Sequence, residues 1–493
     1  MRRMFLLLTL LTSLSLHAQT PKPPNIIFII TDDQGYGDIS AHGNPILKTP
    51  HLDRLHRESV RFTDFHVSPT CAPTRAALLT GRHEFKNGVT HTIHERERLT
   101  LDATTLPQIL KTAGYTTGIF GKWHLGDEAP YRPDQRGFDE TFIHGAGGIG
   151  QSYPGSCGDA PGNTYFDPLI LHNNTFVKTS GYCTDVFFTQ ALTWIKQASE
   201  TETPFYCHIA TNTPHTPLDA RPEDEARYTG KLPPNPAEGK GKGKGPFAQP
   251  GATEKFFGMV ANIDDNIGIL LQKLAEWDLE RDTLVIFMND NGGTGGVRIH
   301  NANMRGQKGT PWLGGTRAAS FWRWPGTLTP ADVPALTAHI DFLPTLIDIT
   351  HAKPDSKTLA QIEGRSLLPL LKNSQSEWPD RTLITHVGRW EQGTNPDTGK
   401  YTNVSIRTPE WQLIQPTKIN QPNWQLYQVK SDPSQTIDVA AQHPDIVKAL
   451  AAQYETWWQQ TLPLMVNENV PLAPANPFKL LYEKQFGPAS LPE

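Results

Sequence analysis

"NIIFIITDD", residues 25–33, is the stretch of sequence that decides the fold class. Its apolar run is short, continuous and rich in isoleucine, which is typical of a parallel strand buried on both faces. Three later runs have the same character: "YTTGIF" (115–120), "FYCHIA" (205–210) and "TLVIFM" (283–288). Helix-like patterns such as "FFGMVANIDDNIGILLQKLAEW" separate them. This alternation predicts an α/β fold in which helices cover both faces of the sheet.

The pattern changes after residue 370. Four short alternating segments, "RTLITHVG", "NVSIRT", "WQLIQ" and "WQLYQV", are joined by turns, and a helical pattern, "PDIVKALAAQYETWWQQ", follows them. Such segments predict a small antiparallel sheet with a C-terminal helix. We therefore expect a main α/β domain over residues 23–372 and a smaller α+β subdomain over residues 373–493.

The N-terminus predicts export. Arg2 and Arg3 precede an apolar run over residues 5–16, and Ala18 closes it, which is the plan of a secretory signal peptide over residues 1–18. The arginines also resemble a twin-arginine signal, but the strongly apolar core favours the general route. The run is short for a membrane span, and no later segment reaches the roughly 18 apolar residues needed. We expect a periplasmic or extracellular protein without a membrane anchor.

The charge balance excludes one class of partner. The chain has 45 basic and 50 acidic residues and a net charge of -5. A protein without an excess of positive charge has no field that would attract nucleic acid, so no nucleic-acid partner is expected. An anionic ligand would have to be bound by local cations.

The four cysteines could form two disulfides in an oxidising compartment. Cys207 lies in an apolar run, where a buried thiol is expected. Cys157 and Cys183 lie in a glycine-rich stretch and are the expected pair. Cys71 is then left over, and it could be a thiol nucleophile, half of a disulfide or the precursor of another group.

Polar residues follow each of the four predicted strands. They are Asp32 and Asp33, Lys122 and His124, His215, and Asp290 with Asn291. Ligands of open α/β sheets bind beyond the carboxyl ends of the strands, so we expect these side chains to share one rim. The three aspartates and the asparagine are hard oxygen donors, which suit Ca²⁺ or Mg²⁺ better than zinc.

In "CAPTRAALLTGR", residues 71–82, the segment "PTRAALLTG" predicts a short helix with Pro73 at its first turn and Gly81 as its stop, which places Cys71 at the helix N-terminus. Backbone N–H groups and the helix dipole favour an anion at that end, and Arg75 would add a fixed cation. A zinc site is not expected, because no second cysteine lies at ligand spacing. A cysteine–histidine hydrolase is an alternative, but it would leave the oxygen ligands without a role.

The pattern C-x-P-x-R followed by "AALLTGR" resembles the signature of the type I sulfatases. Further segments resemble that family in the same order: "PNIIFIITDDQGYGDIS", "TPHLDRL", "GYTTGIFGKWHLG", "RGFDE", "TPHTP", "VIFMNDNGG", "HIDFLPTLIDI" and "WQLYQVKSDPSQTIDVA". The resemblance implies the alkaline-phosphatase-like α/β fold, a mixed sheet between layers of helices. It also implies a sulfuric ester hydrolase.

The resemblance further implies a set of roles. A formylglycine-generating maturation enzyme would oxidise Cys71 to Cα-formylglycine (3-oxoalanine), whose hydrate attacks sulfur. Calcium would be bound by Asp32, Asp33, residue 71, Asp290 and Asn291. Arg75, Lys122 and Lys308 would stabilise the sulfate charge, His215 would protonate the leaving oxygen, and His124 would accept the proton that allows sulfate release. Leu313 departs from the family, where an acidic residue often stands before "GG", and this puts one supporting contact in doubt.

The sequence says less about the substrate, for which we expect a sulfated carbohydrate. Candidate residues for its pocket are His91, His94, Arg96, Gln151, Tyr153 and Trp390. The alternatives are that the two histidines are surface residues and that Trp390 belongs to the core. Two other functions stay open: hydrolysis of phosphoesters or phosphonates at the same site, and sulfoglycan binding without catalysis if Cys71 stays unmodified.

Overall fold

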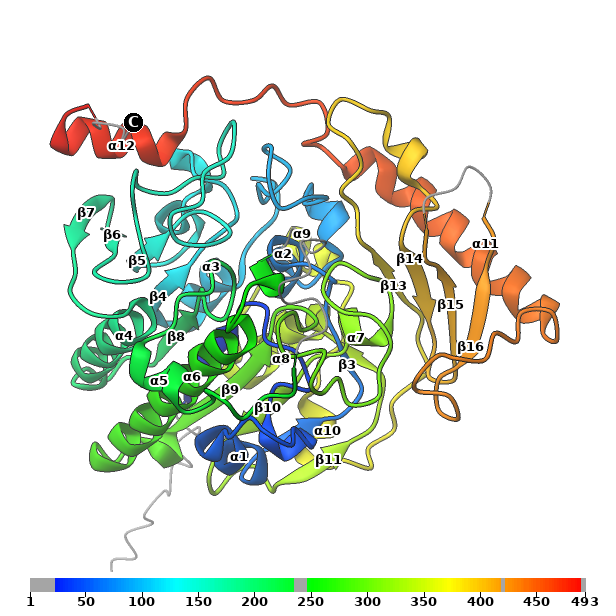
Figure 1. Cartoon of the computed structure of the whole chain (residues 1–493), viewed down its shortest axis with the longest axis horizontal. Coiled ribbons are helices and arrows are strands. Elements are labelled where there is room, and N and C mark those ends of the chain that lie inside the picture. Colours follow the sequence, from blue (N-terminus) through cyan, green and yellow to red (C-terminus); the bar gives the residue numbers. More distant parts are fainter. Residues whose placement is uncertain (1–22, 235–245, 418–421, 489–493) are drawn as a thin grey trace, which may run out of the picture.

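The computed structural model describes residues 23–234, 246–417 and 422–488, so the predicted signal peptide lies outside the described residues. A ten-stranded mixed sheet forms its centre, in the order β11-β2-β10-β9-β1-β8-β4-β5-β6-β7 (Figure 1). The strands are β1 (Asn25–Thr31), β2 (Val60–Phe62), β4 (Thr116–Lys122), β5 (Glu140–His144), β6 (Leu169–His172), β7 (Thr175–Lys178), β8 (Phe205–Ala210), β9 (Thr283–Asn289), β10 (Ser320–Arg323) and β11 (Ala331–Val333).

The four strands predicted from sequence form the middle of this sheet. β1 pairs in parallel with β8 and β9, and β4 pairs in parallel with β8. Their carboxyl ends therefore meet at one edge, as expected. β10 runs antiparallel to β9, and β6 and β7 extend the other side of the sheet as an antiparallel pair.

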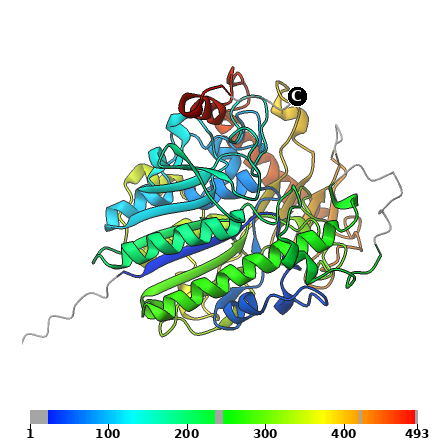
Figure 2. The same ribbon diagram turned by 60° about the vertical axis from the view of Figure 1, so that its left-hand side comes forward.

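Helices cover both faces of the sheet, which confirms the predicted layers (Figure 2). Along β1, Ile26, Phe28 and Ile30 face one buried cluster, whereas Ile27 and Ile29 face the other. The first cluster includes side chains of α2 (Cys71–Thr80), α3 (Leu106–Leu110), α8 (Phe342–Thr350) and α10 (Leu368–Lys372). The second includes side chains of α1 (Pro50–Arg57), α4 (Cys183–Ser199) and α6 (Ala252–Glu276). Three short helices complete the main domain: α5 (Pro222–Ala226), α7 (Leu313–Thr316) and α9 (Ser356–Gln361).

The C-terminal part contains the predicted antiparallel sheet. Its strands are β13 (Leu383–His386), β14 (Val404–Arg407), β15 (Trp411–Gln415) and β16 (Gln425–Gln428), and α11 (Pro444–Thr461) packs on it. A last helix, α12 (Pro477–Phe486), returns to β7 of the main sheet (Figure 1). There Gln485 Oε1 accepts a hydrogen bond from the Phe176 N–H (2.8 Å). The predicted boundary between residues 372 and 373 stays a prediction.

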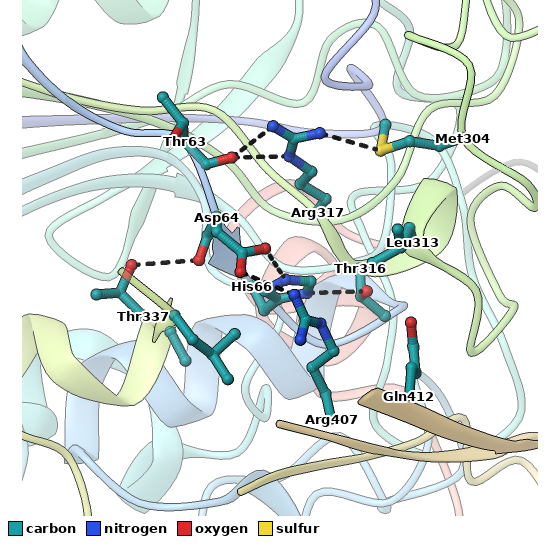
Figure 3. Close-up of polar contacts among 12 residues, drawn as sticks. Thr63, Asp64, His66, Met304, Leu313, Thr316, Arg317, Thr337, Arg407 and Gln412 are labelled. Carbon is teal, nitrogen blue, oxygen red and sulfur yellow. Dashed lines mark hydrogen bonds and ion pairs between the residues drawn. The ribbon is translucent and has the colours of Figure 1, made fainter. Parts of the chain in front are cut away.

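A buried polar network joins the small sheet to the main domain (Figure 3). The segment "VRFTDFHV", which reads as one strand, is split into β2 and β3 (Phe65–His66), which pairs with β12 (Thr337–Ala338). Asp64 lies at the break, where it accepts from Arg407 Nη2 of β14 (2.8 Å) and lies 2.9 Å from His66 Nε2. Burial raises the pKa of Asp64, but His66 and Arg407 outweigh it and hold the pKa below its usual value.

Leu313 lies near this junction, at the start of α7 (Figure 3). Its side chain is buried in an apolar cluster with Met304 and Ile414, and its N–H donates to Gln435 Oε1 (2.9 Å). The apolar residue therefore packs against the C-terminal sheet, where an acid would be desolvated.

The predicted disulfide between Cys157 and Cys183 is wrong. All four cysteines are buried free thiols. Cys183 opens α4 and packs in the core beneath the sheet, whereas Cys157 Sγ donates to the Thr92 carbonyl (3.5 Å). Within the described ranges, no helix is long and apolar enough to cross a membrane.

Candidate active site

The polar residues predicted to share a rim do meet at the carboxyl edge of the sheet. Asp32 and Asp33 follow β1, Lys122 ends β4, and Asp290 follows β9. One ligand atom each of Asp32, Cys71 and Asp290 lies within 4.8 Å of the others, and all three residues are buried.

Cys71 lies at the first position of α2, as predicted. Ala72 and Ala76 pack into the buried cluster shared with α3, α8 and α10 and fix the helix, which is capped by Gly81 with a φ of 68°. Arg75, one turn further on, donates from Nη2 to Asp290 Oδ2 (2.9 Å). Its Nε and Nη1 are buried and have no partner within the described part of the chain. These donors remain free to bind an anion next to Cys71.

The oxygen donors are oriented by hydrogen bonds among themselves. The Asp33 N–H donates to Asp290 Oδ1 (3.1 Å), and Asn291 Nδ2 donates to Asp33 Oδ1 (3.1 Å). Because the amide nitrogen is engaged, Asn291 presents its oxygen, and this Oδ1 and Asp32 Oδ1 are buried with no hydrogen-bond partner among the described residues. Burial and the charge of Asp32 raise the pKa of Asp290 to about 7. Asp32 and Asp290 repel each other, and a hard divalent cation would relieve this repulsion and bind the oxygens that have no hydrogen-bond partner.

Two lysines complete the cationic side of the site. Lys122 Nζ donates to Asp32 Oδ2 (2.6 Å), and Lys308 Nζ lies 2.5 Å from Asp33 Oδ1. Burial alone would lower the pKa of Lys308, but Asp33 and Cys71 raise it above its usual value. Burial would likewise raise the pKa of Asp33, but Lys308 and His215 hold it low. This pair therefore stays charged, and Lys308 contributes a fixed cation.

The two histidines present different atoms to the site. His124 Nε2 lies 2.8 Å from the Thr92 carbonyl, so it donates there and leaves Nδ1 without a partner among the described residues. Burial and the charge of Lys122 hold the pKa of His124 well below its usual value, which makes Nδ1 a proton acceptor. His215 Nδ1 bonds the Thr216 carbonyl (2.6 Å), and its Nε2 lies 3.8 Å from Asp33 Oδ2. Burial lowers the pKa of His215 to about 3, although Asp33 opposes this.

The glycine-rich loop that carries Gln151 and Tyr153, two of the predicted substrate residues, packs against both histidines. A Cβ at Gly147 would lie 3.3 Å from His124 Cε1, and one at Gly148 would lie 3.1 Å from His215 Nδ1. Gln151 follows in this loop and donates to the Thr216 carbonyl (3.1 Å). The glycines at 147 and 148 allow the loop to approach both imidazole rings closely.

Two of the six predicted substrate residues, Gln151 and Tyr153, lie near these groups. The rings of His91 and His94 lie 6.0 Å apart, on either side of Thr92 in the chain, and Tyr153 is 37% exposed. Burial, together with Cys157 and Cys71, raises the pKa of Tyr153, which places its hydroxyl within electrostatic reach of the predicted nucleophile. Burial also lowers the pKa of His91 to about 3, so this ring is neutral.

Arg96 and Trp390 are both buried and paired with each other, as the alternative of a core Trp390 implies, and their substrate role stays a prediction. The Arg96 guanidinium lies 4.7 Å from the centre of the Trp390 ring and donates to the Trp390 carbonyl (2.8 Å). Glu468 accepts from both side chains, at 3.2 Å and 2.6 Å. The pair joins the main domain to the C-terminal part.

Arg389, the neighbour of Trp390, was not among the predicted residues. Its side chain is exposed, and its Nη2 donates to Thr92 Oγ1 (3.1 Å). The Thr92 carbonyl is the group that bonds His124. A single arginine in a loop carries no motif, so no pattern in the sequence indicated this position.

Comparisons with known proteins agree with this geometry. The family model of the sulfatases matches residues 24–352, and the model described as N-sulphoglucosamine sulphohydrolase, C-terminal, matches residues 315–460. Similar curated proteins include arylsulfatase J of Mus musculus (28% identity, 90% of this chain and 77% of that protein). N-acetylgalactosamine-6-sulfatase of Rattus norvegicus is 30% identical over 78% of this chain and 72% of that protein. Arylsulfatase A of Bos taurus is 31% identical over 76% of this chain and 73% of that protein.

Solved structures with the same fold include two saccharide complexes. Ps i-CgsB in complex with k-i-k-neocarrahexaose superposes with a TM-score of 0.74 at 26% identity, covering 91% of this chain and 94% of that one. BT4656 in complex with its substrate D-glucosamine-2-N,6-O-disulfate gives 0.71 at 21% identity, covering 91% and 100%. At 21% identity, the similarity to BT4656 shows a shared fold alone.

Proposed function

The chain belongs to the sulfatase family, and we propose that it is an exported enzyme that hydrolyses sulfate monoesters of sulfated carbohydrates. Hydrolysis of sulfuric esters is the activity of the family. For this chain we further propose the nucleophile, the metal, the role of each side chain, the class of alcohol in the substrate and the cellular compartment.

The observation that carries the proposal is a soft sulfur atom in a set of hard oxygen ligands. Cys71 Sγ lies with Asp32 and Asp290 oxygens within 4.8 Å. A thiol is a poor ligand for a cation that prefers oxygen, whereas an aldehyde or its hydrate matches the set. We therefore propose that a maturation enzyme converts Cys71 to formylglycine, which supplies the oxygen nucleophile for attack on sulfur.

Calcium is the metal we propose for Asp32, Asp33, Asp290 and Asn291, with residue 71. When bound, it would neutralise sulfate charge and favour the ionised nucleophile. The donor set supports a hard cation, because two of its oxygens are buried without hydrogen-bond partners in the described structure.

The side chains around this set have distinct tasks. Arg75, Lys122 and Lys308 bind the sulfate oxygens and stabilise the charge that spreads over them in the transition state. His215 Nε2 faces the site and donates a proton to the departing alcohol oxygen; the negative charge of a bound sulfate favours the imidazolium that this requires. His124 Nδ1 accepts the proton whose removal lets sulfate leave.

A carbohydrate alcohol is supported by the polar mouth of the site and by the relatives. His91, His94, Gln151 and Tyr153 offer hydrogen bonds rather than an apolar pocket. Proteins similar to this chain are named N-acetylgalactosamine-6-sulfatase or bind neocarrahexaose. The N-terminal signal pattern, which lies outside the described residues, is the basis for export.

Sulfate release from a panel of sulfated saccharides and aryl sulfates tests the proposal. The enzyme must come from a host that can mature it, and matched phosphate esters are run alongside. We expect saccharide sulfates to be cleaved, and the Cys71→Ala variant to be inactive. Turnover limited to small aryl esters would refute the carbohydrate claim, and faster turnover of phosphate esters would favour the phosphoester alternative.

A further inference from the structure

A cleft of about 380 Å³ opens beside the predicted sulfate site. Lys308 and its neighbour Gln307 line it together with Arg298 and Arg389. The cleft wall therefore combines a predicted catalytic lysine with two arginines, one from the loop after β9 and one from the loop after β13.

Both arginines lack acidic partners. Arg298 donates from Nε to Thr253 Oγ1 (3.0 Å) and from Nη1 to the Pro233 carbonyl (3.2 Å). Arg389 donates only from Nη2, to Thr92 Oγ1. Neither forms an ion pair with any described residue, and none of the described residues that line the cleft is an aspartate or glutamate. Two exposed guanidinium groups thus line a concave surface to which the described residues contribute no acidic side chain.

The backbone holds Arg389 in a strained conformation. Its φ is 61°, in the left-handed region, and its N–H donates to the Thr90 carbonyl (3.1 Å). The preceding Gly388 packs so closely that a Cβ there would lie 2.1 Å from the Thr90 oxygen. Strain of this kind persists only where the surrounding structure enforces it, and it is concentrated at binding sites.

Arg389 also faces the mouth of the active site. Its charge acts on Tyr153 and on His91, two of the predicted substrate residues, and Tyr153 also feels Lys308 and Cys71. The remaining cleft wall includes Phe247 and Val297, which offer an apolar surface to a sugar ring. The two arginines, the concave surface and its place beside the predicted sulfate site together match one sugar unit that carries an anionic group.

From this geometry we infer that the Arg298–Arg389 cleft is an anion subsite for a carboxylate or second sulfate on the saccharide whose sulfate ester is cleaved. The inference rests on the proposed function and names its substrate class as polyanionic saccharides. A guanidinium fork binds the oxygens of either group in two parallel hydrogen bonds, which a lysine cannot do.

The test compares three substrates that share one cleavable sulfate: a form with an adjacent uronate, its carboxyl-reduced form, and a form with a second sulfate instead. The uronate form and the disulfated form carry two anionic groups, and the carboxyl-reduced form carries one. For each enzyme, kcat/KM on each dianionic substrate is divided by kcat/KM on the monoanionic substrate. Charge-assisted hydrogen bonds predict that R389Q and R298Q each lower this ratio by about 10-fold to 100-fold. R389K should recover only part of it. R57Q, on the exposed end of α1, is the control and should leave the ratio at its wild-type value.

A binding arm separates this inference from the proposed function. Calorimetry with the Cys71→Ala protein gives affinities for the same saccharides without turnover. If no saccharide is cleaved but R389Q in the Cys71→Ala background still loses affinity for the dianionic forms, the subsite stands and the proposed activity fails. If saccharides are cleaved and the ratios of R389Q and R298Q equal the wild-type ratio, the subsite is refuted. A preference for the uronate form or the disulfated form identifies which anion the cleft selects.

Discussion

Replacing Glu97 with glutamine should change how the stability of the protein depends on pH. Glu97 is 1% exposed, accepts a hydrogen bond from Ser156, and has its Oε2 without a partner among the described residues. Burial raises its pKa from 4.5 to about 7. The folded chain therefore keeps a proton that the unfolded chain releases between these values, so the free energy of unfolding falls as pH rises through this window.

The size of the effect follows from the two pKa values. At about 1.36 kcal/mol for each pH unit, a group that titrates near 7 when folded and near 4.5 when unfolded loses roughly 2–3 kcal/mol of stability between pH 5 and pH 8. Glutamine has nearly the same shape and no such proton. The E97Q variant should therefore gain roughly 2–3 kcal/mol relative to the wild type over the same range.

Urea unfolding of both proteins at pH 5 and pH 8 measures this difference, provided that the slope with denaturant is unchanged. E202Q, at an exposed position, is the matched control and should follow the wild type at both values. A constant stability difference between E97Q and the wild type across the range would refute the assignment of a buried, protonated Glu97.

Three further predictions concern the site and its support. Lys122→Met should lower kcat/KM on an aryl sulfate by about 100-fold or more, because the transition-state charge loses a buried cation; an effect below about 10-fold would count against this role. Removing bound metal with a chelator should abolish sulfate release and lower the melting temperature, with both restored by calcium; full activity in the chelator would contradict a metal requirement. Asp64→Asn should lower the free energy of unfolding by about 3–5 kcal/mol, because it leaves Arg407 buried without its carboxylate, and denaturant titration would show no such loss if the network were unimportant.

The central layers of the fold could be predicted because they depend on local patterns. Continuous apolar runs predicted the four middle strands, and the polar residues directly after these strands predicted the site at the carboxyl edge of the sheet. "VRFTDFHV" (60–67) has the local pattern of one strand, because nothing in the segment shows that Asp64 turns away to bind Arg407, 343 residues later in the chain.

The sequence indicated the residues around Cys71 more clearly than the residues that surround the substrate. Trp390 was predicted as a substrate residue, and the structure buries it while its neighbour Arg389 is exposed, because only the packing decides which of the two faces inward. Cys157 and Cys183 were paired because both lie in a glycine-rich stretch, whereas in the fold Cys183 opens α4 and packs in its core cluster, and Cys157 donates to the Thr92 carbonyl. These outcomes depend on contacts between distant segments, which leave no periodic signal.

The mass of the peptide that carries residue 71 tests the central claim most directly. The protein should be made in a host with a competent maturation enzyme and digested under conditions that preserve aldehydes. The account predicts a mass about 18 Da below that of the cysteine peptide, as expected when a thiol becomes an aldehyde. An unmodified Cys71 in protein that nonetheless releases sulfate would contradict it.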